Sequence, residues 1–327
     1  MNSADYRIRP YVEADYDAES RVRSLLRPDQ VRSAEEIRAW DRQLAGPGML
    51  NLRLAAEDRR SGTAIGFGAL FHFPWAYHPD RYWITVAVAP DHQHRGVGRE
   101  LYGALEVRGR ERRAECFYAS VRADEARSLR FFSQAGFQEM RRIWNSRLDL
   151  GNVRLAARTG SSTEWSRAGV EFTTLAEEGP DKADVQQRLY DLASEVGLDI
   201  PTVGRPTRLS FAQFNQLWFG SPGFLTEGTF LATSGARYVA VSSLSRLSGE
   251  PDALRIEFTG VRREFRGQGL ASELKRRTVD YAQRHHIRFL RASNDSQNVG
   301  IWRINERLGF QVEQVYVDGR KDLTSPL

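Results

Sequence analysis

The sequence of 327 residues predicts a mixed α/β protein that contains two copies of one domain. A glycine-rich segment occurs twice, at residues 88–98 and 261–271, with an offset of 261 − 88 = 173 residues. The same offset relates residues 135–137 to residues 308–310, and both of these segments end in Gly-Phe. Strand and helix patterns also alternate along each half, which indicates an α/β or α+β domain. Two landmarks in one register indicate an internal duplication.

Length and composition suit two domains of ordinary size. The apolar fraction of 41% is sufficient for two hydrophobic cores. The sequence has no run of about 18 apolar residues, and its first residues lack the apolar stretch of a signal peptide. Cys116 is the only cysteine, which excludes an internal disulfide and a cysteine-based metal cluster. We therefore expect a cytoplasmic protein without a membrane partner.

The basic charge of the chain does not by itself indicate nucleic-acid binding. The net charge is +5, and 47 − 3 = 44 of the basic residues are arginine, because only Lys182, Lys275 and Lys321 are lysines. Acidic and basic residues are interleaved, and no long basic arm is present. We expect no nucleic-acid partner, although a modest basic excess suits a polyanionic cofactor.

Helix and strand signals alternate through residues 1–152, the first expected domain. Ser33 and Glu36 form a capping box at the start of one helix. The turn residues at 58–62 separate two alternating segments, which predicts a hairpin. Gly136 suits the left-handed position that ends a helix. The expected strands are 6–9, 50–57, 63–71, 82–88, 117–121 and 137–148, and the expected helices are 15–26, 33–44, one beginning at 97, and 125–134.

Residues 170–327, the second expected domain, repeat this order of elements. Residues 153–169 have weak periodicity and are expected to be a linker or a strand exchanged between the domains. Gly235 marks a hairpin turn, and Gly309 ends a helix. The expected strands are 170–174, two within 224–246, 254–261, 289–292 and 310–317, and the expected helices are 182–195, 211–219, one beginning at 270, and 298–307.

Each glycine-rich segment lies between an expected strand and an expected helix, which is an arrangement that binds anions. The first N–H groups of a helix lack partners and carry partial positive charge, and glycine lets a phosphate approach the backbone closely. The segments lack the Gly-Lys-Ser/Thr of a P-loop and the third glycine of a dinucleotide-binding fingerprint. A phosphate-containing ligand of another class is therefore indicated.

These segments resemble the signature of a known family. Residues 93–98 and 266–271 read Gln-x-x-Gly-x-Gly and Arg-x-x-Gly-x-Ala. The pattern Gln/Arg-x-x-Gly-x-Gly/Ala is typical of the GNAT N-acetyltransferases, which use acetyl-CoA. The resemblance covers residues of about 6–149 and 170–317. It implies tandem GNAT folds, each with a mixed, mostly antiparallel central sheet, flanking helices and a splayed strand pair.

The resemblance also implies which residues bind the cofactor. In the family the amides of the turn bind the pyrophosphate of coenzyme A, and the pantetheine arm lies between the splayed strands. Asn294 and Asn298 resemble asparagines that bind coenzyme A in one branch of the family, although helix capping is an alternative role; the first half has Val121 and Glu125 instead. The implied residues are Thr85, Val86, Val88, Gln93, His94, Arg95, Gly96, Val97, Gly98, Arg99, Thr259, Val261, Arg266, Gly267, Gln268, Gly269, Leu270, Ala271, Asn294 and Asn298.

Acetyl transfer to an amine requires a proton acceptor. Deprotonating an amine with a pKa of about 10.4 at pH 7 costs about 4–5 kcal/mol. We predict Glu257 as the base, because it lies four residues before Val261 on an expected buried strand and hence on the same face. Its first-half equivalent is Ile84, and an ion pair with Arg255 is the alternative role of Glu257. The tyrosine acid of the family is absent from both halves.

The sequence therefore predicts an acetyl-CoA-dependent N-acetyltransferase that acts on the primary amine of a small molecule. The amine would attack directly in a ternary complex, in the second half of the chain, with a backbone N–H near Val261 polarising the thioester and no metal. Aromatic residues at 71–77 and 211–224 are expected to line acceptor sites. A non-catalytic acyl-CoA sensor or scaffold, and acetylation of a protein or peptide amine, remain alternatives. Either a monomer or a homodimer is compatible with the sequence.

Overall fold

The computed structural model describes residues 5–27, 31–153, 165 and 169–323. Its contacts divide the chain into two compact units. Unit 1 contains residues 1–140, 203–207 and 317–327, and unit 2 contains residues 141–202 and 208–316. Each unit is a mixed α/β structure with a mostly antiparallel sheet, which confirms the predicted fold class. Most of the expected linker at 153–169 lies outside the described residues.

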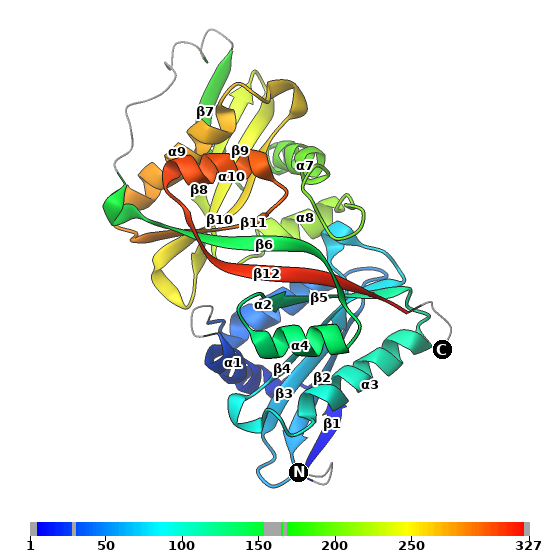
Figure 1. Ribbon diagram of the computed structural model, residues 1–327. Helices are drawn as coiled ribbons and strands as arrows, with labels where there is room; N and C mark the ends of the chain where they lie inside the picture. Colours follow the sequence, from blue (N-terminus) through cyan, green and yellow to red (C-terminus); the bar gives the residue numbers. More distant parts are fainter. Residues whose placement is uncertain (1–4, 28–30, 154–164, 166–168, 324–327) are drawn as a thin grey trace. The chain divides into compact units, whose positions relative to one another are not determined.

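Unit 1 contains the elements of the first half of the sequence. They are β1 (Tyr6–Pro10), α1 (Asp15–Leu26), α2 (Ala34–Leu44), β2 (Asn51–Asp58), β3 (Ala64–Phe71), η1 (Pro74–Ala76), β4 (Arg81–Val88), η2 (Pro90–His92), α3 (Val97–Glu111), β5 (Cys116–Arg122) and α4 (Ala126–Gln134). The strand order is β1-β2-β3-β4-β5, and only the β4–β5 pair is parallel. Figure 1 shows the helices α1 and α3 beside these strands. Leu101 and Leu105 of α3 pack in one cluster with Leu70, and Val22 of α1 packs in another with Phe67.

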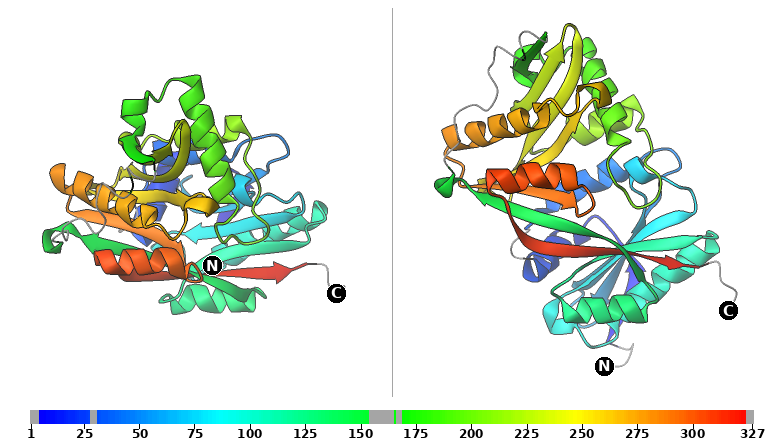
Figure 2. Two further views of the ribbon diagram at one scale, coloured as in Figure 1. Left: turned by 90° about the horizontal axis from the view of Figure 1, so that it is seen from above. Right: turned by 45° about the horizontal axis from the view of Figure 1, so that its top comes forward.

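Unit 2 repeats this arrangement. Its elements are β6 (Gln138–Asp149), η3 (Leu150–Asn152), β7 (Val170–Thr174), α6 (Leu175–Glu178), α7 (Ala183–Gly197), α8 (Phe211–Trp218), β8 (Phe224–Ser234), β9 (Arg237–Leu247), β10 (Glu250–Val261), η4 (Arg263–Phe265), α9 (Leu270–Arg284), β11 (Phe289–Asp295), α10 (Val299–Leu308) and β12 (Gln311–Asp322). The strand order is β6-β11-β10-β9-β8-β7, and β10 runs parallel to β11. Figure 2 shows the orange α9 and the green α7 on opposite faces of the yellow strands.

Two long strands, β6 and β12, belong to both units (Figure 1). Residues 143–149 of β6 pair with β11 in unit 2, whereas residues 317–322 of β12 belong to unit 1, whose order continues from β5 to β12. Each half of the sequence therefore gives its last strand to the sheet of the other half. Residues 203–207, which connect α7 to α8, also belong to unit 1, where the Thr207 amide donates to the Trp75 carbonyl at 2.8 Å.

Local signals explain where several helices begin and end. The predicted capping box at α2 is present: the Glu36 amide donates to Ser33 Oγ at 3.2 Å, and the Ser33 amide donates to Glu36 Oε2 at 2.9 Å. Gly136 has a φ of 89°, as expected for a left-handed helix end. No helix in the described ranges is both long and apolar enough to cross a bilayer.

Candidate active site

The first glycine turn, residues 93–98, connects the end of β4 to α3 through η2. Gly96 has a φ of 86° and is the N-cap of α3, and His94 also has a positive φ of 63°. The Gln93 side chain donates from Nε2 to the Val88 carbonyl at 3.0 Å, which ties the turn to the end of the strand. The first amides of α3 have no acceptors within the helix, so they are available to an anion.

The second glycine turn, residues 266–271, has the same construction. Gly267 and Gly269 have φ values of 78° and 81°, and Gly269 is the N-cap of α9. Arg266 donates from Nε to the Val261 carbonyl at 3.0 Å, as Gln93 does to Val88 in the first turn. The first residue of each motif, Gln93 or Arg266, therefore binds the last carbonyl of the preceding strand through its side chain. The sequence alone did not predict this role.

Two residues distant in sequence contact the second turn. The Asp199 carboxylate pairs with Arg263 and, at 2.5 Å, with Arg266. Hydrogen bonds from these guanidinium groups, that of Arg263 foremost, lower the pKa of Asp199 to about 2. Trp165 donates from Nε1 to the Gln268 carbonyl at 3.3 Å. Asp199 lies 67 positions before Arg266, and Trp165 lies 103 positions before Gln268. No local sequence pattern therefore links these two residues to the motif.

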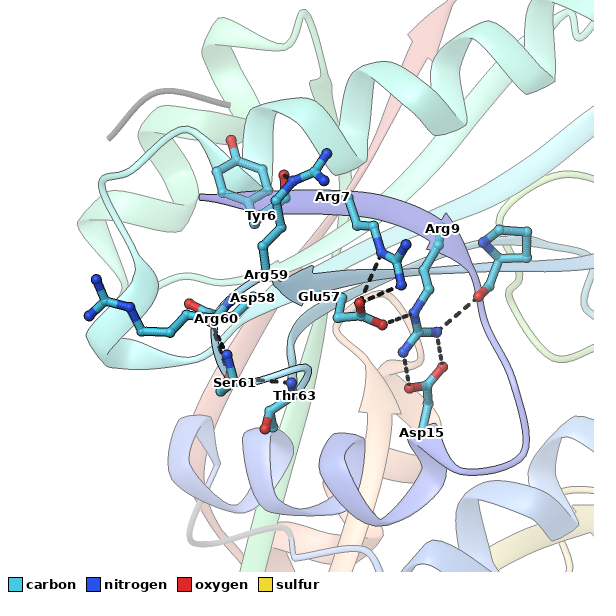
Figure 3. Close-up of polar contacts among 11 residues, drawn as sticks. Tyr6, Arg7, Arg9, Asp15, Glu57, Asp58, Arg59, Arg60, Ser61 and Thr63 are labelled. Atoms are coloured by element: carbon cyan, nitrogen blue, oxygen red, sulfur yellow. Dashed lines mark hydrogen bonds and ion pairs between the residues drawn. The ribbon is translucent and has the colours of Figure 1, made fainter. Parts of the chain in front are cut away.

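The first turn is bordered by β1, which a cluster of ion pairs holds in place. Arg9 contacts Asp15 at 2.7 Å and Glu57 at 2.5 Å (Figure 3). These contacts fix β1 so that the Tyr6 hydroxyl lies 3.4 Å from the position that a Cβ on Gly96 would occupy. Burial raises the pKa of Tyr6 to about 12, so this hydroxyl remains a neutral donor beside the turn at physiological pH.

Both units have the splayed strand pair that the fold class predicts. β4 and β5 pair only from Arg81 with Cys116 to Trp83 with Tyr118. β10 and β11 pair only from residues 253 and 289 to residues 256 and 292. Beyond these points the parallel strands have no ladder hydrogen bonds with each other, so their facing backbone groups are available to a ligand. Each splay leads directly into a glycine turn.

A β-bulge changes the placement of Glu257 from the one that the sequence predicts. Leu244 of β9 lies opposite Ile256, but the next residue, Ser243, lies opposite Phe258, so Glu257 is an extra residue. Ile256 and Val261 both pack in the cluster on the α9 face, whereas Phe258 packs on the α7 face. Because the bulge interrupts the alternation along β10, the spacing of four residues from Val261 does not fix the face of Glu257. Glu257 is also exposed rather than buried.

The first unit has no counterpart of this bulge. β3 and β4 pair without a register shift from residues 66 and 88 to residues 71 and 83. Trp83 therefore occupies the ladder position of Arg255, at an offset of 172 rather than 173. The structural counterpart of Ile84 is Ile256 rather than Glu257. Glu257 is thus a residue that only the second half contains.

A buried hydroxyl holds the Glu257 carboxylate. Ser245 is 4% exposed and donates from Oγ to Glu257 Oε1 at 2.6 Å. Arg255, the alternative partner that the sequence offers, has its Nη1 at 3.9 Å from the same oxygen. The carboxylate side chain is 47% exposed, so Oε1 is fixed while solvent can reach the group. This arrangement is chemically suited to accepting a proton.

The two asparagines of the second half have different contacts. Asn298 is the N-cap of α10, and its side chain accepts from the Ile301 amide at 3.4 Å. Asn294 Oδ1 accepts from Asn305 Nδ2 at 2.7 Å, and Asn305 Oδ1 accepts from Lys275 Nζ at 2.6 Å. Burial lowers the pKa of Lys275 to about 7. The sequence analysis missed this network, because it joins two helices and a strand.

The aromatic segments expected near acceptor sites form clusters within their units. In unit 1, Phe73 stacks on Trp75 at 4.7 Å and contacts Trp40 and Trp83 edge-on at 6.0 and 5.1 Å. In unit 2, Trp218 of α8 contacts Phe258 edge-on at 5.4 Å. Phe258 follows Glu257 in β10, so this second cluster lies next to the bulge. An apolar surface beside the carboxylate suits a partly apolar acceptor.

Comparisons with known proteins agree with this geometry. Residues 17–137 and 198–310 match the model of the acetyltransferase (GNAT) family. A ribosomal protein bS18 alanine N-acetyltransferase from Salmonella typhimurium is 33% identical over 98 residues, 29% of this chain and 58% of that protein. A GCN5-related N-acetyltransferase structure from Sphaerobacter thermophilus has a TM-score of 0.70 at 21% identity, over 98% of this chain and 97% of that one. A tandem GNAT protein from the clavulanic acid biosynthesis pathway has a TM-score of 0.74 at 17% identity, over 99% and 100%.

Proposed function

Because the chain belongs to the acetyltransferase (GNAT) family, we propose that it transfers an acetyl group from acetyl-CoA to the primary amine of a small molecule. We place the reaction in the second half of the chain. The observation that carries this choice is the bulged Glu257, a hydroxyl-anchored carboxylate at the splay of unit 2. In unit 1, whose β3–β4 ladder has no bulge, the ladder holds no such residue.

Coenzyme A fits the second turn on chemical grounds. The first amides of α9 are donors without intrahelical acceptors. Among the residues that the structure describes, a Cβ on Gly269 would meet only Trp165, at 3.9 Å, so the surface beside these amides is open there. The turn residues would hold the pyrophosphate, and the arm would lie along the splayed strands. The residues of unit 2 proposed to contact the cofactor are Thr259, Val261, Arg266, Gly267, Gln268, Gly269, Leu270, Ala271, Asn294 and Asn298.

In the proposed reaction the amine nitrogen attacks the thioester carbonyl, a C–N bond forms and the C–S bond breaks. Glu257 takes the amine proton, directly or through a water molecule. Without a base this deprotonation costs about 4–5 kcal/mol at pH 7, whereas a thiolate with a pKa of about 8.5 leaves at a cost of about 2 kcal/mol. The backbone N–H groups of β10 near Val261 would stabilise the developing oxyanion. The missing acid is therefore less important than the base.

The first test is Glu257→Gln. The amide retains the shape of the side chain and cannot take a proton, so kcat should fall by a factor on the order of 10²–10⁴. Calorimetry should show unchanged coenzyme A binding. Glu171→Gln, an exposed glutamate on β7, is the matched control and should retain full turnover. Full turnover by Glu257→Gln would remove the proposed base.

Aspartate substitutions at the two N-cap glycines test which half is active. An aspartate at Gly269 or Gly96 places a negative charge at the helix amides, where a phosphate would bind, and aspartate tolerates a positive φ better than most residues. Gly269→Asp should abolish turnover, and Gly96→Asp should retain it. The opposite result would assign catalysis to the first half.

The similarity to the Salmonella enzyme, whose name gives an alanine of a ribosomal protein as the acceptor, supports a second acceptor class, the amine of a protein or peptide. A panel of small amines and of peptides beginning with alanine, assayed by release of coenzyme A, separates the two classes. Tight binding of acetyl-CoA without turnover of any amine would instead favour a sensor or scaffold.

A further inference from the structure

Lys275 of α9 is a buried lysine whose ammonium group contacts an amide. Its side chain is 1% exposed, and Nζ donates to Asn305 Oδ1 at 2.6 Å. Within the described ranges no carboxylate pairs with this Nζ, and burial lowers the pKa of the lysine. Burying an amine without a counter-charge is costly, so the position calls for an explanation beyond packing.

The lysine determines the direction of two amide groups. In the structure Nζ of Lys275 donates, so Asn305 turns its oxygen toward the lysine. Asn305 Nδ2 then donates to Asn294 Oδ1 at 2.7 Å. Asn294 must therefore direct its own Nδ2 away from Asn305. Among the residues that the structure describes, none accepts a hydrogen bond from this Nδ2.

Asn294 lies at the splay of unit 2. It is two residues beyond Ala292, the last residue of β11 that pairs with β10. Ala292 packs in the cluster on the α9 face, and alternation along the strand places Asn294 on the same face. The free donor of Asn294 therefore lies on the part of β11 that no longer pairs with β10. It is on the face of the sheet that α9 covers.

The first half shows that the fold does not require this network. At the offset of 173, Tyr102 replaces Lys275, Phe132 replaces Asn305 and Val121 replaces Asn294. Phe132 is buried in the apolar cluster of unit 1, and Val121 packs against that cluster. Tyr102 keeps a polar contact, since its hydroxyl accepts from Lys321 Nζ at 2.9 Å, but the positions of the two asparagines are filled by apolar side chains. The polar network of the second half is better explained by a ligand than by stability.

We propose that Lys275 is a positioning residue that holds Asn294 as an N–H donor toward an amide carbonyl of the pantetheine arm of coenzyme A. The inference rests on the proposed function. It adds the residue that determines whether the Asn294 side chain offers a donor or an acceptor at the splay. Lys275 itself does not contact the cofactor; it acts through Asn305.

The test compares two ligands in a Gly96→Asp background, in which only the second turn is open to phosphate. Lys275→Met removes the donor, and Asn305→Asp keeps a partner for Lys275 but cannot donate to Asn294. Both variants should bind coenzyme A about 10-fold more weakly by calorimetry, as expected for one lost or reversed hydrogen bond. Adenosine 3′,5′-bisphosphate, which lacks the pantetheine arm, should bind with unchanged affinity.

Two controls separate positioning from structural damage. Lys182→Met changes an exposed lysine and should bind both ligands normally. Lys275→Met/Asn305→Leu makes both partners apolar, so it should unfold at no lower temperature than Lys275→Met and still bind coenzyme A weakly. Unchanged coenzyme A binding by both single variants, or an equal loss of both ligands, would overturn the inference. Failure of the parent protein to bind coenzyme A would instead overturn the proposed function.

Discussion

The burial of Lys275 predicts how stability depends on pH. Burial lowers the pKa of this lysine from its ordinary value of 10.5 to about 7 in the folded protein. Between these two values the unfolded chain holds a proton that the folded chain has lost, so the free energy of unfolding rises with pH. The limiting slope is about 1.4 kcal/mol per pH unit. From pH 7 to pH 9 the lysine should therefore add about 2 kcal/mol to stability.

The measurement compares the wild type with Lys275→Met. Urea denaturation at pH 5, 6, 7, 8 and 9 gives the free energy of unfolding of each protein, and the difference between the two proteins cancels groups that titrate alike in both. The difference should be flat below pH 6, where the lysine is protonated in both states. Above pH 7 it should increasingly favour the wild type.

A difference that stays flat from pH 7 to pH 9 would refute the reasoning. It would mean that Lys275 keeps its ordinary pKa in the folded protein, because its Nζ reaches either water or a carboxylate. A difference that falls with pH would mean that a negative charge stabilises the ammonium. Either result would also mean that Lys275 is not an amine buried without a counter-charge, which is the starting point for the role assigned to its contact with Asn305.

Three further predictions concern other positions. Asp199→Asn should tighten coenzyme A binding about threefold at low ionic strength, because a negative charge leaves the second turn; calorimetry at low and high salt checks this. Gly109→Ala should lower the free energy of unfolding by about 1–3 kcal/mol in urea denaturation, since the new Cβ would lie 2.3 Å from the Phe117 ring. Ser245→Ala should lower kcat several-fold with unchanged coenzyme A affinity, because Glu257 loses the hydroxyl that fixes Oε1. An unchanged kcat would show that the hydroxyl does not position the carboxylate.

Much of the fold could be predicted from the sequence because the signals for it are local. The capping box of Ser33 with Glu36 and the left-handed Gly136 depend on a few consecutive residues. The duplicated glycine turns depend on a motif of six residues at residues 93–98 and 266–271. Such patterns are set by backbone sterics and hydrogen bonding within one turn of chain. These features can therefore be predicted without knowledge of the tertiary structure.

The position of Glu257 could not be predicted in the same way. A bulge depends on which residue of the neighbouring strand lies opposite, and the sequence of β10 alone does not contain that information. The one-residue insertion lies before the first aligned landmark, and residues typical of strands flank it on both sides, so the offset between the landmarks does not show it. The contact of Lys275 with Asn305 is hidden for a related reason, since 30 residues separate them. A lysine in an amphipathic helix is expected to face solvent.

The comparison of the two halves leads to one conclusion about how a duplicated domain divides its work. Both turns keep left-handed glycines and a side chain that closes the turn onto its strand, so the geometry for binding a phosphate is present twice. Glu257, the proposed base, and Lys275, the proposed positioning residue, lie in the second half. A phosphate site requires only backbone amides, which any sequence supplies. Acyl transfer requires particular side chains. Divergence of the first half toward apolar residues would therefore abolish catalysis before it abolished phosphate binding.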